Sequence, residues 1–137
     1  MPGLQESPMF VPPLIDGVGA GAEVFETKTA SFTPTAADSG KVFLIVGATA
    51  NVAVTLPAIA TGPFHFRIIN LSDVTLTVAS VVADTLYTFN DIAADSVAFS
   101  TSAELIGGEV EVICNGTIIA ALARVASIYQ TVTIATS

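Results

Sequence analysis

The sequence of 137 residues is acidic and apolar, with twelve acidic residues, four basic residues and a net charge of −8. Lys and Arg neutralise nucleic-acid phosphates and anionic lipids, so we expect neither nucleic acid nor a membrane surface as a partner. Only 12 % of residues are charged and 52 % are apolar, whereas an average soluble domain has about 25 % charged residues. This excess predicts that some surface is buried against other chains; the alternative is that small apolar residues fill a β core.

Residues 1–22 differ in composition from the rest of the chain. Four of the seven prolines lie here, together with Gly3, Gly17, Gly19 and Gly21, so neither a helix nor a central strand is expected. The segment is nevertheless rich in large apolar side chains, which disordered tails usually lack. We predict an extended N-terminal arm over 1–22; the alternative is a terminus without fixed structure. The expected contact residues of the arm are Leu4, Met9, Phe10, Val11, Leu14 and Ile15.

From residue 23 onward the sequence is typical of β-structure, because Thr and Val dominate and β-branched side chains suit a pleated sheet. Strands are expected over 24–32, 42–46 and 52–56, with turns at 34–40 and 47–51. The second of these strands is apolar throughout, which indicates either a contact between copies of the chain or a core strand covered on both faces. The candidates for the contact between copies are Phe43, Leu44, Ile45 and Val46.

The second half of the sequence continues this pattern of short strands and turns. Phe64, Phe66 and Ile68 should face the core, with His65 and Arg67 outward. Further strands are expected over 74–78, 85–89, 97–100, 109–114, 117–125 and 128–136.

A hairpin is expected at Asn115-Gly116, the strongest short hairpin signal in the chain. The following stretch, 118–127, is rich in Ala and compatible with a helix, but the turn before it favours a strand. Short strands at regular spacing predict a small antiparallel β-sandwich or barrel over residues 23–137.

No group of residues is typical of catalysis, cofactor binding or metal binding. His65 is the single histidine and is expected at the surface, so a Ser-His-Asp arrangement is poorly supplied. One Cys and one His are too few for zinc, and Asp91 and Asp95 are spaced as in an acidic loop without EF-hand spacing. Glu109 and Glu111 share a strand face, as a glycosidase pair would, but a solvated face explains them more simply. We expect no enzyme activity, no cofactor and no metal.

The single cysteine, Cys114, excludes an internal disulfide and is expected to be a small buried apolar residue. No run of 18 apolar residues predicts a membrane span. The N-terminus has neither a basic start nor an apolar stretch of the kind found in signal peptides, so we expect synthesis in a cytoplasm.

Four short motifs resemble a β module that recurs in structural proteins of tailed bacteriophages. They are an Asp-Ser-Gly-Lys turn that enters a strand, a Thr-Leu-Pro that ends one, a Gly-aromatic step that enters the next, and an Asn-Gly hairpin after a late strand. Here they lie at 38–41, 55–57, 62–66 and 114–116. The resemblance spans residues 31–125, and such modules occur in capsid decoration (cement) proteins and in tail fibres or spikes.

A short chain with an apolar arm, and without a coiled coil or shaft repeat, is similar to the decoration proteins. The resemblance implies a homotrimer on the outer surface of the virion capsid, bound to the major capsid protein. It also implies that the arms clamp neighbouring capsid subunits and stabilise the expanded head, because linked contacts act at high effective concentration. The alternative is a receptor-binding module of a tail fibre, spike or head fibre.

Overall fold

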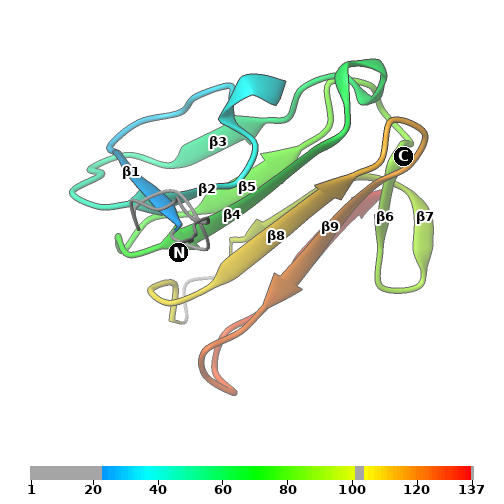
Figure 1. Ribbon diagram of the computed structural model, residues 1–137. Coiled ribbons are helices and arrows are strands. Elements are labelled where there is room, and N and C mark those ends of the chain that lie inside the picture. Colours follow the sequence, from blue (N-terminus) through cyan, green and yellow to red (C-terminus); the bar gives the residue numbers. More distant parts are fainter. Residues whose placement is uncertain (1–22, 101–103, 137) are drawn as a thin grey trace, which may run out of the picture.

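The computed structural model describes residues 23–100 and 104–136, and the regular structure within them is all β (Figure 1). This confirms the predicted fold class; the predicted arm, 1–22, lies outside the described residues. Two short 3-10 helices, η1 (Ala36–Asp38) and η2 (Ile59–Thr61), lie in connecting loops. The strands are β1 Val24–Lys28, β2 Lys41–Ile45, β3 Val52–Thr55, β4 Phe64–Asn70, β5 Leu76–Ala79, β6 Leu86–Thr88, β7 Asp91–Phe99, β8 Glu109–Cys114, β9 Ile119–Arg124 and β10 Thr133–Thr136.

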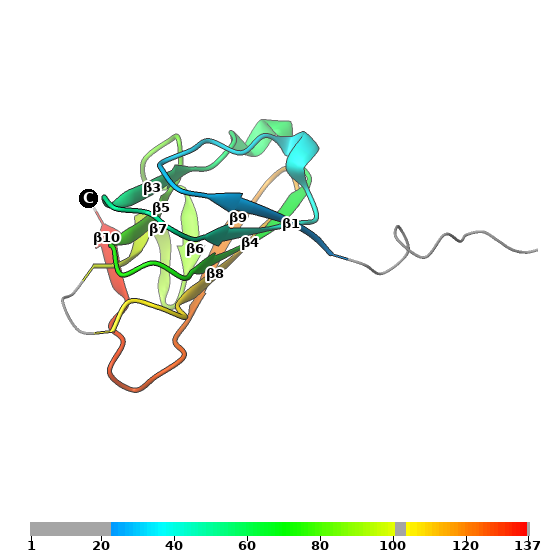
Figure 2. The same ribbon diagram turned by 90° about the vertical axis from the view of Figure 1, so that its left-hand side faces the viewer.

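The strands form a single sheet that curls into a half-barrel (Figures 1 and 2). Their order is β1-β2-β4-β8-β9-β6-β7-β5-β3, with β10 beside β7. Five strand pairs are antiparallel and four are parallel, so the sheet is mixed, whereas the sequence predicted an antiparallel one. The parallel β2–β4 pair arises because β3 leaves for the opposite edge of the sheet, and the chain then returns by a crossover connection.

The segment after β1 connects the two edges of the sheet. The N–H of Phe32 donates to the carbonyl of Ala53 at 3.2 Å, and the N–H of Thr55 donates to the carbonyl of Phe32 at 3.2 Å. The ring of Phe32 lies 4.8 Å from that of Phe43, between ring centroids. The strand predicted over 24–32 is therefore divided into two parts. The first part is β1, and the second is a single bridge between Phe32 and Val54 of β3.

The core is built largely by alternation along the strands, which is strict in β4. In β4, Phe64, Phe66 and Ile68 are buried while His65 and Arg67 lie on the outer face, as predicted. The largest fully buried side chains are Phe43, Phe66, Phe99, Ile45, Leu56, Ile68, Leu76, Leu86, Ile119, Val42, Val52 and Val54.

The Ala-rich stretch forms strand β9 and no helix, which confirms the strand prediction. The prediction of an acidic loop at Asp91 and Asp95 was wrong, because both lie on the nine-residue strand β7. The carboxylate of Asp91 accepts the N–H of Ala93 at 2.8 Å, and that of Asp95 accepts the N–H of Asp84 at 2.7 Å. These carboxylates therefore satisfy backbone groups within and next to the β6–β7 hairpin.

The turn at 38–41 docks on the beginning of β4. The Asp38 carboxylate accepts the N–H of Thr35 at 2.9 Å and the ammonium of Lys41 at 2.8 Å. The hydroxyl of Ser39 accepts the N–H of His65 at 2.9 Å, and the N–H of Gly40 donates to the carbonyl of His65 at 2.7 Å. This motif is therefore a structural connection between β2 and β4.

The motifs at 62–66 and 114–116 meet in space. A Cβ atom on Gly62 would lie 2.8 Å from the sulfur of Cys114 and 3.0 Å from the nitrogen of Gly116, so a side chain at Gly62 would force its neighbours apart. Cys114 is buried, as predicted. The side chain of Asn115 accepts two backbone N–H groups and closes the predicted β8–β9 hairpin.

Candidate functional site: a paired charged face and an apolar loop end

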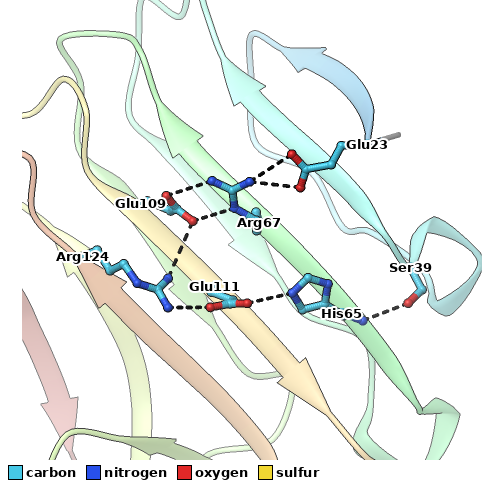
Figure 3. A network of polar contacts seen from close by, with 7 residues as sticks. All are labelled: Glu23, Ser39, His65, Arg67, Glu109, Glu111 and Arg124. Atoms are coloured by element: carbon cyan, nitrogen blue, oxygen red, sulfur yellow. Dashed lines mark hydrogen bonds and ion pairs between the residues drawn. The ribbon is translucent and has the colours of Figure 1, made fainter. Parts of the chain in front are cut away.

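Charged side chains gather on the outer face of β4, β8 and β9 (Figure 3). The guanidinium of Arg67 contacts Glu109 at 2.8 Å and Glu23 at 3.0 Å. The guanidinium of Arg124 contacts Glu111 at 2.6 Å and Glu109 at 3.7 Å. A ring nitrogen of His65 lies 2.9 Å from the other oxygen of Glu111. We call these residues, Glu23, His65, Arg67, Glu109, Glu111 and Arg124, the charged face.

The electrostatics of the charged face favour the ionised state of Glu111. His65 and then Arg124 lower the pKa of Glu111 through their hydrogen bonds. Hydrogen bonds to Glu109 and Glu23 raise the pKa of Arg67. The arrangement therefore fits a stabilising ion-pair network.

A second group of ion pairs fastens β1 to β2. The ammonium of Lys41 contacts Asp38 and Glu26, each at 2.8 Å, and these hydrogen bonds raise the pKa of Lys41 to about 12. Lys28 and Lys41 lower the pKa of Glu26. The ammonium of Lys28 also lies 5.0 Å from the centroid of the Phe32 ring, a cation–π contact that supports the connection between the sheet edges.

Within residues 23–100 and 104–136, no group of three or more His, Cys, Asp or Glu side chains is placed to hold a metal ion. In the same ranges, no helix has the length and hydropathy needed to cross a bilayer.

A different kind of surface lies where four connections meet at one end of the half-barrel. We call this surface, formed by residues 46–51, 71–75, 104–108 and 125–132, the loop end. The last of these connections, between β9 and β10, projects beyond the sheet in both views (Figures 1 and 2). In these four ranges the charged residues are Asp73 and Glu104 alone.

Buried polar side chains fix three of these connections to one another. The amide nitrogen of Asn70 donates to the carbonyls of Val74 at 2.9 Å and Leu105 at 3.2 Å. Its amide oxygen accepts the N–H of Ser72 at 3.1 Å. The hydroxyl of Ser72 donates to the carbonyl of Ile45 at 3.0 Å, joining this network to the end of β2. Asn70 and Ser72 are both buried.

Gln130 fixes the fourth connection. Its side chain is buried, donates to the carbonyl of Ile106 at 2.8 Å and accepts the N–H of Ala126. Gly107 adopts a φ of 100°, and a Cβ there would lie 2.9 Å from that of Ala126. The projecting loop is therefore seated closely on the loop that precedes β8.

Large apolar side chains are exposed on this ordered end. Ile128 is 89 % exposed and Tyr129 is 63 % exposed, in the middle of the projecting loop. The exposed large apolar residues of the loop end are Val46, Leu71, Ile106, Val125, Ile128 and Tyr129. The loop end thus combines buried polar side chains that fix the loops with apolar side chains that face solvent. These are the features of a preorganised binding surface.

The sequence-based contact candidates are divided by the fold. Phe43 and Ile45 are buried in the core, so they are unavailable to another chain, and this part of the prediction is corrected. Their alternation places them on the inner face of β2. Leu44 is half-buried on the opposite face, and Val46 is exposed in the loop end. The six arm candidates lie outside the described residues.

Sequence reasoning missed the other five residues of the apolar set. Leu71 and Ile106 lie in loops without strand periodicity. Val125, Ile128 and Tyr129 fall in the strands predicted over 117–125 and 128–136, but β9 ends at Arg124 and β10 begins at Thr133, so this part of the prediction was wrong. One signal was available: the inward series of β4, Phe64, Phe66 and Ile68, continues to Asn70 and so places an amide in the interior.

Comparison with protein-family models and with curated protein sequences finds no match to this chain.

Proposed function

We propose that this chain is a structural virion protein of a tailed phage, which binds the outer capsid surface as a homotrimer and stabilises the expanded head. The observation that carries the proposal is the loop end, where apolar side chains are exposed on loops fixed by buried amide and hydroxyl groups. The charged face supports a structural role, because its carboxylates pair with Arg and His side chains in a network that joins neighbouring strands. The resemblance of the four motifs supplies the phage context.

In this proposal the β domain is a rigid platform and residues 1–22 reach neighbouring subunits of the major capsid protein. Each contact is modest, but three linked copies bind together through their high effective concentration. The arm residues proposed for this contact are Leu4, Met9, Phe10, Val11, Leu14 and Ile15.

A receptor-binding module of a tail fibre or spike is the second candidate. The projecting β9–β10 loop favours it, because an exposed tyrosine on an ordered loop is a common anchor in binding modules. The two candidates place the protein at different positions on the particle.

Immunogold electron microscopy of virions from the phage that encodes this chain separates the candidates. Label distributed over the heads supports the capsid role, label at tail tips supports the receptor-binding role, and unlabelled particles contradict both.

Binding to purified expanded capsids tests the arm. The Phe10→Ser, Val11→Ser variant should bind at least tenfold more weakly than the unaltered chain. The Phe89→Ser, Ile92→Ser variant, altered at exposed apolar residues of the β6–β7 hairpin, is the matched control and should bind normally. Equal binding by the two variants would remove the arm from the proposal.

A further inference from the structure

We infer that the loop end is the surface through which one copy of this chain binds another. This inference deepens the proposed function by naming the contact of the homotrimer, and it rests on self-association being part of that function. It concerns residues of the described domain, and it requires nothing of the arm or of the capsid.

The area of the apolar surface fits a contact between proteins. The exposed fractions of its six large apolar residues correspond to roughly 300 Å² of apolar surface, at about 100 Å² for each fully exposed side chain. A stable interface buries about 800 Å² on each partner, of which somewhat more than half is apolar. The loop end therefore supplies a large share of the apolar part of one standard interface.

Charge favours the loop end over the rest of the surface for a contact between two copies. Each copy carries a net charge of −8, so most pairs of surfaces would bring like charges together. The loop end is poor in charge, with Asp73 and Glu104 as its two charged residues. Two acidic copies can approach here with little repulsion. A partner recognised through charge complementarity would instead use the acidic surface outside this end.

The shape of the loop end provides both halves of a head-to-tail contact. Ile128 and Tyr129 lie in the middle of the β9–β10 loop and are its most exposed large apolar residues. A depression of about 310 Å³, lined by Asp73, Glu104, Leu105 and Ile106, lies at the same end. A projection on one copy that meets a recess on the next is a head-to-tail contact, which can close into a ring as a trimer requires. Each of the two contacts made by a copy then uses part of the loop end.

The ordering of the loops makes the contact favourable. Gln130 holds the projecting loop from below through Ile106 and Ala126, so association does not need to order this segment. A preorganised loop loses less conformational entropy on binding than a loop without such contacts.

The test is the molar mass of the full-length chain in solution, by light scattering on a sizing column. The unaltered chain should give the mass of three chains of 14.0 kDa each. The Ile128→Ser, Tyr129→Ser variant should associate more weakly, with a dissociation constant at least a hundredfold higher. At the same protein concentration it should therefore elute with the mass of one chain. The control is Phe89→Ser, Ile92→Ser, whose side chains are 64 % and 67 % exposed on the β6–β7 hairpin, and it should keep the mass of the unaltered chain.

Circular dichroism and urea denaturation establish that both variants fold, which is expected because all four side chains are exposed. Hydrogen exchange of the unaltered chain gives a second readout: amides in 125–132 should exchange more slowly as protein concentration rises. A monomeric unaltered chain overturns the inference, and so does a Ile128→Ser, Tyr129→Ser variant that retains the oligomeric mass, or a control that loses it. Immunogold labelling of heads is independent of these results. Labelled heads would support the capsid role even if the loop end were not the contact between copies, and a loop-end contact could be found even if the heads were unlabelled.

Discussion

The charged face and the loop end are stabilised by opposite arrangements of polar and apolar side chains. On the charged face, polar groups lie outside, on regular strands, and pair with one another across the sheet. At the loop end, polar groups lie inside and hold irregular backbone, while apolar side chains face solvent. Partly exposed ion pairs contribute little because water and salt screen them, whereas a buried amide is costly to remove. The loop end should therefore be the more sensitive region.

The largest effect is expected for Asn70→Ala. Asn70 is fully buried, and its loss leaves the carbonyls of Val74 and Leu105 and the N–H of Ser72 without this partner. We expect the free energy of unfolding to fall by about 3 kcal/mol. Urea denaturation measures it, with Asn90→Ala at the exposed β6–β7 turn as the control, expected to change stability by less than about 0.5 kcal/mol. Equal losses for the two variants would mean that the buried network does not hold the loops.

A smaller effect, of about 2 kcal/mol, is expected for Gln130→Leu, which keeps the size of the side chain but removes both of its hydrogen bonds. The amide of Ala126 should then exchange with solvent faster than in the unaltered chain. Ser127→Ala, in the same loop, removes a single contact to the N–H of Tyr129 and should cost less than about 0.5 kcal/mol. A stable Gln130→Leu protein with unchanged exchange would show that the loop is held by other contacts.

The sequence predicts the charged face far better than the loop end, and the reason is physical. Strand alternation has a period of two, so the outward positions of His65, Arg67, Glu109 and Glu111 follow from their neighbours. The Asn115-Gly116 hairpin is local in the same sense. The anchors of the loop end act over distance: Asn70 reaches Leu105, 35 residues away, and Gln130 reaches Ile106, 24 residues away.

The parallel strand pairs were unpredictable for the same reason. β6 and β9 pair in parallel although β7 and β8 separate them in sequence, and no local pattern specifies such a pairing. The first half of β7 was missed because Asp91, Asp95 and Ser96 are typical of turns, and here their strand is stabilised by neighbours on both sides.

On the charged face, Arg67→Met should lower the free energy of unfolding by about 1 kcal/mol, because Arg67 joins β4 to Glu109 on β8 and to Glu23 before β1. Its side chain is 31 % exposed, against 52 % for Arg124. The more exposed pair is better screened, so Arg124→Met should cost less, and urea denaturation of both variants measures the order. The opposite order would place the centre of the network at Glu111 and remove Arg67 from that role.

The smallest effect concerns pH. Because His65 and Arg124 lower the pKa of Glu111 below its usual value of 4.5, the folded state favours the ionised carboxylate more than the unfolded state does. The resulting stabilisation is fully present above pH 4.5 and is lost as the pH falls through the lower folded pKa. Glu111 is partly exposed, so we expect a contribution below about 0.5 kcal/mol. Glu111→Gln removes the titration, and its free energy of unfolding should depend less on pH below 4.5 than that of the unaltered chain. In about 1 M salt, where the Debye length is about 3 Å, the difference between the two proteins should shrink. A stabilisation of the unaltered chain relative to Glu111→Gln that grew as the pH fell below 4.5 would have the wrong sign for a carboxylate held ionised by its neighbours.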